Sequence, residues 1–450
     1  HGDFQQTLEN MMSRRMLFVT LGEKLHPSEY ASRYPKAEQA FFNIRNAQSM
    51  RGQSYNARLE AAFIDRKMAP ALDLLKTRPG VFARRIVAML CIANKKVQES
   101  IFAEFEHAAK HVSMNVLFNL LSYVRKGQDL GHSAYMPKGS VAKVFVRNEL
   151  RHQLSYTKRN RLCALVESAL EHHMQSLPAL GKVYLNPDLR GLMMPHGLRN
   201  ASQEARTMVR GSRIALPKAS NIVRCFMWWK EGSERVDLDL SVVFLNEKMQ
   251  MTQQCSWTNL RGEFMAHSGD ITSAPKGACE FIDFNLDHVD EASRYALMVV
   301  NAYTNTKYKD LPEAFAGFMM RSKLGQRGEI FDARTVMQKF DLVSDGRVAM
   351  PMMIDLKTRE YVWMDLGAKS YPSFPGTYQV ENQKAYARSA VKTMATLSKP
   401  TLGEVMDLHM QYRPGTTYVA SKEEADVVID WDGSITPFDH ATMSSQFMAE

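Results

Sequence analysis

Apolar residues in the first part of the chain recur at the spacing of an α-helix. Between about residues 38 and 176, aliphatic residues stand three and four positions apart, as at Leu117, Leu120, Leu121 and Val124. Such a stripe covers one face of a helix and packs against a neighbouring helix. Pro–Gly breaks at 78–80 and 137–139 separate the segments, because proline lacks the amide hydrogen that a helix interior needs. The pattern predicts a helical domain over residues 1–180, built as a bundle or as helical repeats.

The spacing changes to two after about residue 181. Val236, Leu238 and Leu240 alternate with acidic and polar residues, as expected of a strand with one buried face. Residues 295–301 are apolar on both faces and predict a central strand. Residues 350–356 and 360–366 flank a short polar turn and predict a hairpin. Many short strands with few helices indicate a two-sheet β-sandwich over residues 211–380.

Helical spacing returns in the last part of the chain, at residues 382–397 and 402–412, and the last segment is acidic. The predicted fold class is therefore α+β multidomain. It comprises a basic helical domain (1–180), a junction (181–210), a β-sandwich (211–380) and a short helical C-terminal extension with an acidic tail (381–450).

Composition narrows the class of protein. Apolar residues make up 45% and charged residues 23% of the chain, which is typical of a globular protein. No window approaches the ~18–20 consecutive apolar residues of a membrane helix, and residues 1–10 contain no apolar signal core. The 5 cysteines are scattered and never spaced as CxxC, which disfavours a disulfide framework or a zinc site. We therefore expect a cytoplasmic protein without a membrane span.

Charge is unevenly distributed. Residues 1–200 hold 29 Lys+Arg and 16 Asp+Glu, whereas residues 201–450 hold 28 and 32. A basic region of this kind suits an acidic partner such as RNA, or is simply a well-solvated helical surface. If it binds nucleic acid, the candidate phosphate contacts are Arg84, Arg85, Lys158, Arg159 and Arg161.

Two carboxylates share one side of a predicted strand. Residues i and i+2 of a strand point the same way, so Asp237 and Asp239 project together. Gly269 permits a tight turn that could bring Asp270 towards them. Oxygen donors in this arrangement suit a hard cation such as calcium. The alternative is a solvated strand face with Asp270 as a turn-former.

Four linked motifs resemble the TerD domain of tellurium-resistance and stress-response proteins. They are the acidic strand, an Asn–Leu pair, an HSGD turn and a strand of the form E-x-I-x-F-x-L. In this chain they are Asp237–Asp239, Asn259–Leu260, His267–Asp270 and Glu280–Leu286. They occur in the family's order over about seventy residues, and longer relatives have a helical region before this domain.

The resemblance implies a calcium-binding β-sandwich of a bacterial stress, tellurite-resistance or phage-defence system. It implies Asp237, Asp239, Asp270 and Glu280 as calcium ligands, and a non-enzymatic scaffold that acts through protein partners. The loop 271–279 departs from the family pattern because it has no carboxylate. Since calcium takes ~6–8 oxygen ligands, we expect at most one site. An RNA-binding protein is the alternative.

One segment resembles a catalytic motif. Asp430-Trp431-Asp432-Gly433 matches the first motif of haloacid-dehalogenase phosphatases, but only 16 residues follow Ser434. No Ser-His-Asp, HExxH or P-loop pattern is visible, so we expect no enzymatic activity.

Overall fold

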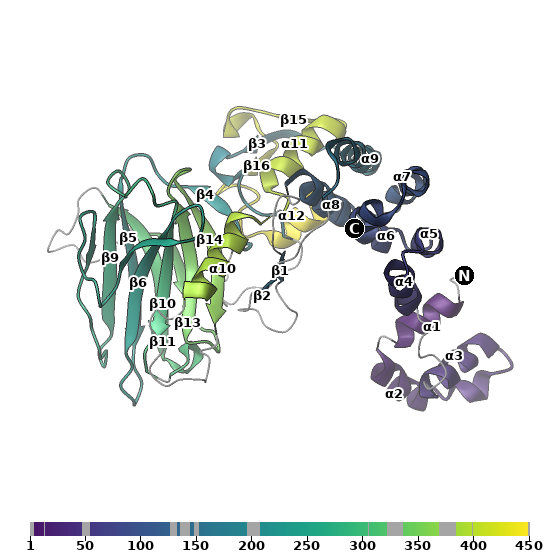
Figure 1. The fold of residues 1–450 in the computed structure, drawn as a ribbon, viewed down its shortest axis with the longest axis horizontal. Coiled ribbons are helices and arrows are strands. Elements are labelled where there is room, and N and C mark those ends of the chain that lie inside the picture. Colours follow the sequence, from purple (N-terminus) through teal and green to yellow (C-terminus); the bar gives the residue numbers. More distant parts are fainter. Residues whose placement is uncertain are drawn as a thin grey trace. The chain divides into compact units, whose positions relative to one another are not determined.

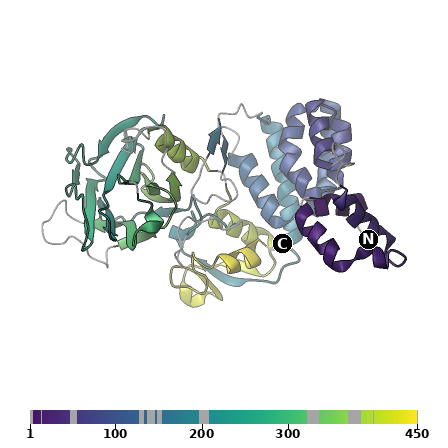
Figure 2. The same cartoon turned by 90° about the horizontal axis from the view of Figure 1, so that it is seen from below.

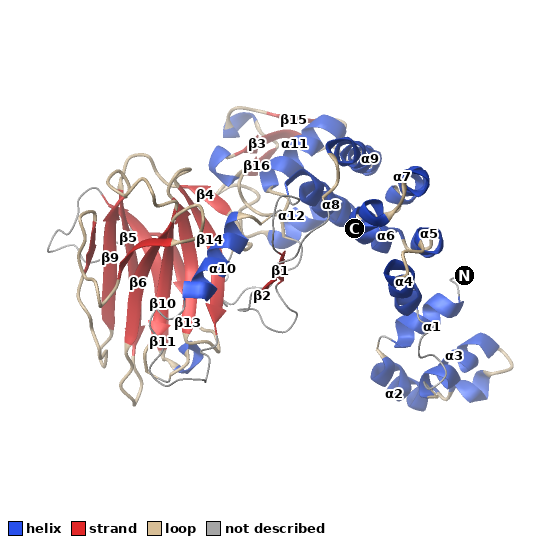
Figure 3. Cartoon of the chain, in the orientation of Figure 1, coloured by secondary structure: helices blue, strands red, loops and turns tan. Residues whose placement is uncertain are grey.

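A computed structural model describes most of the chain and shows a mixed helical and sheet protein, with helices in the N-terminal part and several antiparallel sheets (Figure 3). No described helix is long and apolar enough to cross a membrane. The breaks expected at 137–139, most of the junction (196–207) and the end of the predicted sandwich (369–380) lie outside the described residues. The described residues are 4–12, 14–46, 55–126, 133–135, 145–147, 153–195, 208–304, 306–321, 336–368, 384–397 and 399–448.

The chain divides into two compact units. The first comprises residues 1–112 and 154–165, and the second comprises residues 113–153 and 166–450. The division therefore falls within a helix and not near residue 180.

The first unit is helical, as its apolar spacing predicts. Successive helices contact one another in pairs, and Phe82 meets Phe105 edge-on with ring centroids 5.2 Å apart. Pro79 stands at the start of a helix, where its missing amide hydrogen costs nothing. The helices are α1 (Phe4–Met12), α2 (Arg15–Leu25), α3 (Pro35–Arg45), α4 (Tyr55–Ile64), α5 (Met68–Lys76), α6 (Pro79–Ile92), α7 (Lys95–Ala109) and the first part of α9 (Tyr156–Met174), with the 3-10 turn η1 (Pro27–Tyr30).

The second unit contains the predicted two-sheet sandwich (Figure 1). Phe244 of one sheet packs edge-on against Phe264 and Phe284 on the side of the other. The first sheet has the order β4 (Arg213–Ala215), β14 (Glu360–Ala368), β13 (Val348–Asp355), β10 (Tyr295–Ala302), β6 (Leu238–Leu245) and β7 (Met251–Cys255). The second has the order β12 (Val336–Asp341), β11 (Glu313–Arg321), β5 (Ile222–Lys230), β9 (Ala278–Asn285) and β8 (Met265–His267).

Helix α10 (Lys384–Ala395) covers the outer face of the first sheet (Figure 2). Val391 and Met394 pack into a buried cluster with Val243, Leu297 and Val362. Alternate residues of one strand thus face the helix, while the others face the second sheet. Strand β6 is buried on both faces for this reason.

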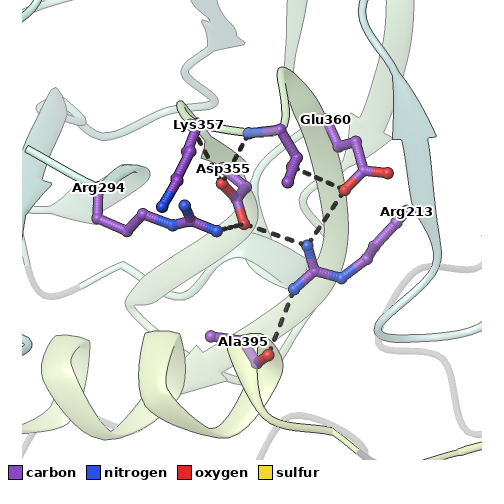
Figure 4. A network of polar contacts seen from close by, with 7 residues as sticks. Arg213, Arg294, Asp355, Lys357, Glu360 and Ala395 are labelled. Atoms are coloured by element: carbon purple, nitrogen blue, oxygen red, sulfur yellow. Dashed lines mark hydrogen bonds and ion pairs between the residues drawn. The ribbon is translucent and has the colours of Figure 1, made fainter. Parts of the chain in front are cut away.

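Asp355, at the end of β13, binds Arg213 of β4 and Arg294, which directly precedes β10 (Figure 4). Its carboxylate is 2% exposed and accepts Arg294 at 2.8 Å and Arg213 at 3.4 Å. The backbone amides of Lys357 and Thr358 donate to the other oxygen at 3.2 Å. Arg213 also donates to the carbonyl oxygen of Ala395, at the end of α10.

The C-terminal extension is not only helical, which differs from the expectation. Helix α11 (Leu402–Tyr412) and helix α12 (His440–Phe447) are present, but β15 (Thr416–Tyr418) and β16 (Val427–Ile429) lie between them. Both strands pair in parallel with β3 (Gly181–Leu185), from the predicted junction. Arg413 supports this sheet by donating to the carbonyl oxygens of Pro178 and Gln446.

The region predicted as helical also contains a short antiparallel pair, β1 (Ser133–Tyr135) with β2 (Phe145–Arg147). This pair follows helix α8 (Met114–Lys126), which the leucine spacing predicts. The described loops of the second unit also contain 3-10 turns, which are η4 (Pro187–Leu189), η5 (Tyr308–Asp310) and η8 (Lys422–Glu424).

Candidate metal site at the edge of the sandwich

The candidate site lies beside the part of β6 that extends beyond the end of its neighbour β7. Strand β7 ends at Cys255, opposite Val242, so the backbone of Leu240 has no strand partner on that side. Two side chains take the place of the missing strand. Glu280 accepts the Leu240 amide at 3.1 Å, and His267 Nε2 lies 3.2 Å from the Leu240 carbonyl oxygen. Side chains from β8 and β9 therefore close the edge of the first sheet.

The turn after β8 is held in place by its own residues. The amide of Gly269 donates to His267 Nδ1 at 3.0 Å, which leaves the His267 Nε2 hydrogen to donate to Leu240. Ser268 exchanges two hydrogen bonds with the backbone of Phe281 on β9. Gly269 has φ of +121°, a conformation that side chains disfavour. Burial lowers the pKa of His267, which favours this neutral, hydrogen-bonded ring.

The turn places Asp270 close to Asp239, which lies in β6, and to Asp237, which directly precedes β6. Ligand oxygens of Asp237, Asp239 and Asp270 all lie within 4.8 Å of one another. Asp237 and Asp239 are buried, and Asp270 is exposed. Burial and the charge of Asp270 raise the pKa of Asp237. The sequence prediction that these three carboxylates converge is thus confirmed, and their mutual repulsion favours a cation between them.

The side chain of Asn301 is a fourth oxygen donor, on the same face of the sheet as Asp239. Asn301 pairs with Asp239 across the β6–β10 ladder, so their side chains lie on one face. Asn301 is 4% exposed and Asp237 is 7% exposed. Among the described residues, neither Asn301 Oδ1 nor Asp237 Oδ1 finds a hydrogen-bond partner. Buried oxygens without a donor are unusual in proteins, and a bound cation would satisfy both.

Glu280 occupies a different position from the three aspartates. Its Oε1 accepts the amide of Ile271 at 2.8 Å, and its Oε2 accepts that of Leu240. Burial, together with the charges of Asp239 and Asp270, raises its pKa to about 8 against the lowering effect of these amides. Both oxygens are therefore engaged with backbone, and Glu280 is not one of the converging carboxylates. Its role as a ligand stays a prediction.

Glu231 was not singled out by the sequence, yet it fixes the loop that follows Asp270. Its carboxylate accepts the amides of Val236 at 3.0 Å and Ala274 at 2.9 Å, and the hydroxyl of Ser273 at 3.0 Å. These hydrogen bonds lower its pKa. Glu231 thereby links Val236, just before β6, to the loop 271–279 through hydrogen bonds.

The predicted nucleic-acid contacts lie on α6 and α9 of the helical unit. Arg85 forms an ion pair with Glu60, and Arg161 pairs with Glu99 at 2.7 Å. Arg84 donates to the carbonyl oxygen of Gly80, one turn earlier in its own helix. Lys158 is close enough to Cys91 for its charge to affect that thiol, and Arg159 also lies on α9. Whether these residues contact RNA stays a prediction.

The phosphatase-like segment is held by ion pairs. Lys422 lies 2.5 Å from Asp430 Oδ2 and 2.9 Å from Asp432 Oδ1. Asn186, at the end of β3, donates to Asp430 Oδ1 at 2.6 Å. These contacts hold the loop after β16 against the end of the parallel sheet.

The solved structures that resemble part of the chain include the following two. One is a homologue of the telluride resistance protein TerD from Streptomyces coelicolor A3(2), 12% identical, with a TM-score of 0.28, covering 34% of this chain and 93% of that one. The other, described as a protein of unknown function, is 14% identical, with a TM-score of 0.28, covering 35% and 94%. No protein-family profile and no curated protein matches the chain.

Likeness at these identities and TM-scores carries no conclusion about function. What the fold and the side chains define is a β-sandwich with an acidic, oxygen-only group at one sheet edge. Function has to be inferred from that group.

Proposed function

We propose that the sandwich binds one calcium ion between Asp237, Asp239, Asp270 and Asn301. The observation that carries the proposal is the pair of buried oxygens, on Asp237 and Asn301, that lack a donor among the described residues beside three converging carboxylates. All four donors are oxygens, which calcium prefers, whereas zinc prefers nitrogen and sulfur. We assign Glu280 the role of holding the edge of β6 and the start of the following loop.

The elements that carry the group suit a binding function. Asp239 and Asn301 come from two adjacent strands, Asp237 directly precedes the first of them, and Asp270 comes from a turn hydrogen-bonded to β9. A cation would therefore link the two sheets at their open edge. We propose that the protein acts as a non-enzymatic scaffold of a TerD-type stress or defence system, through partner proteins. The cytoplasmic location expected from the sequence belongs to this proposal.

Thermal unfolding tests the metal site. Calcium should raise the melting temperature of the full chain relative to EDTA, because it binds only the folded arrangement. Asp237→Asn together with Asp239→Asn should abolish the rise. A matched control, Asp310→Asn with Glu313→Gln, removes two exposed carboxylates elsewhere on the sandwich and should retain it. An unchanged wild-type melting temperature in calcium would refute the site.

RNA binding by the helical unit is the second candidate, and it rests on charge. The ion pairs of Arg85 and Arg161 do not favour it, because a paired guanidinium must give up its carboxylate to bind phosphate. RNA retention that falls steeply with salt would support it. No retention at low ionic strength would dismiss it.

A further inference from the structure

Large apolar side chains on the described surface of the sandwich are few, and they follow the ends of the two strands that neighbour β6. Within residues 208–368, the exposed ones are Trp257 (38%), Leu260 (39%) and Tyr303 (49%). We call these three residues the rim. Scattered single apolar residues on a surface need no explanation, but a set confined to one site does.

The rim flanks the acidic group on both sides of β6. Tyr303 follows β10, and its amide donates to the Asp237 carbonyl oxygen at 3.0 Å. On the other side, the turn containing Trp257 directly follows the end of β7. Leu260 accepts the amide of His267, the first residue of the turn that carries Asp270, at 2.7 Å. The two strands that neighbour β6 thus each contribute apolar residues beside the site.

Two arginines add positive charge at the same place. Arg235 precedes Asp237 by two residues, and Arg261 directly follows Leu260. Both are exposed, and Arg235 Nε donates to the Thr272 carbonyl oxygen at 2.8 Å. With the site empty, the three aspartates oppose these charges. Glu234 and Glu263, which are also exposed, stand beside these arginines. A bound calcium ion offsets most of the charge of the three aspartates, so the surface repels anions less.

The cation itself would have room for an outside ligand. Three carboxylates and the amide oxygen of Asn301 supply fewer donors than the ~6–8 that calcium takes. Asp270 is exposed, so the group opens to solvent. A phosphate oxygen from a partner can therefore complete the coordination.

We propose that the rim, with calcium bound, docks the sandwich on an anionic phospholipid surface. This proposal rests on the proposed calcium site and identifies a phospholipid membrane as the partner of that site. Tryptophan and tyrosine favour the headgroup level of a membrane, and leucine favours the acyl region next to it. Three side chains offer far less area than the about 1,200–2,000 Å² of a stable protein interface. A membrane, in contrast, can be held by a few apolar anchors combined with charge.

Co-sedimentation of the full chain with vesicles tests this. Vesicles of equal parts phosphatidylserine and phosphatidylcholine should retain the protein in calcium and release it in EGTA, whereas pure phosphatidylcholine should retain little. The triple variant Trp257→Ala, Leu260→Ala, Tyr303→Ala should bind at least about tenfold more weakly, because its anchors are lost. It should keep the calcium-induced rise in melting temperature. Trp431→Ala, which removes an equally exposed tryptophan (38%) outside the sandwich, should bind like the wild type.

The outcomes separate the two proposals. A calcium-induced rise in melting temperature without vesicle binding would overturn the membrane surface and leave the metal site, with an acidic protein as the remaining kind of partner. Vesicle binding that is equal in calcium and EGTA, or unchanged in the triple variant, would also overturn it. No effect of calcium on melting would overturn both.

Discussion

Asn301 is the member of the candidate site that carries no charge. It faces Asp239 across two paired strands, and its buried oxygen lacks a donor among the described residues. Asn301→Asp should lower the melting temperature in EDTA, because it adds a fourth carboxylate to a group that already repels itself. The same change should enlarge the calcium-induced rise, because calcium affinity increases with ligand charge. Calorimetry with and without calcium measures both effects, and an equal loss in the two conditions would contradict the assignment.

Glu280 predicts a pH dependence of stability. Its pKa is raised from 4.5 to about 8 in the folded protein, so the folded state holds its proton more tightly than the unfolded chain. Between these values stability should fall as pH rises, by at most about 1.4 kcal/mol per pH unit. Comparing wild type with Glu280→Gln in EDTA isolates this slope from the opposite contribution of His267, whose pKa is lowered. Parallel stability curves for the two proteins would show that Glu280 does not titrate in this window.

At the scale of single residues, the sequence predicts part of the candidate metal site. Residues two apart on a strand must share a side, which places Asp237 beside Asp239, and the glycine turn brings Asp270 to them. Asn301 could not be found in this way, because its place opposite Asp239 depends on the register of two strands sixty residues apart. The sequence likewise gives no sign that Glu280 is engaged by two backbone amides.

At the scale of elements, the Asp355 network joins parts that are distant in the sequence. Asp355→Asn should lower the free energy of unfolding by about 2–4 kcal/mol, because it leaves Arg213 and Arg294 partly buried without their shared carboxylate. Denaturant titration measures the change. Asp345→Asn removes an exposed carboxylate paired with Lys307 and Lys309, and should cost less than about 1 kcal/mol. Equal losses in both variants would contradict the importance of burial.

Periodicity predicts long elements well and short ones poorly. The spacing that defines α8, α10 and α11 and the alternation that defines β6 and β10 are read directly from the residues. Strands β15 and β16 have 3 residues each, too few to show a period. Their extended form depends on pairing with β3, more than 200 positions away, so residues 381–450 were expected to be only helical.

At the scale of the whole molecule, Arg413 connects the middle of the chain to its last described helix. Its buried guanidinium donates to the Pro178 carbonyl oxygen at 2.6 Å and to that of Gln446 at 3.0 Å. Arg413→Leu should destabilise the second unit by about 1–3 kcal/mol, because the carbonyl oxygens of Pro178 and Gln446 lose the buried guanidinium that donates to both. Hydrogen exchange should show faster opening of β3, β15 and β16, with the sandwich unchanged. Uniform protection across the second unit would contradict this local role.

The two-sheet architecture follows from the alternation of the middle segment, whereas the division into units does not follow from composition. The change from helical to strand spacing near residue 181 suggests a domain boundary there. The compact units divide the chain within α9. They reflect contacts between distant segments and not local spacing, so the predicted domain bounds stay a prediction.

The early end of β7 has a consequence for the behaviour of the protein in concentrated solution. An exposed strand edge is a template on which another chain can add by backbone pairing. Here Glu280 accepts the amide hydrogen of Leu240 and His267 donates to its carbonyl oxygen, so neither group is open to an incoming strand. The residues that shape the cation site thus also guard against self-association, and losing them would favour edge-to-edge aggregates even while the core remained folded.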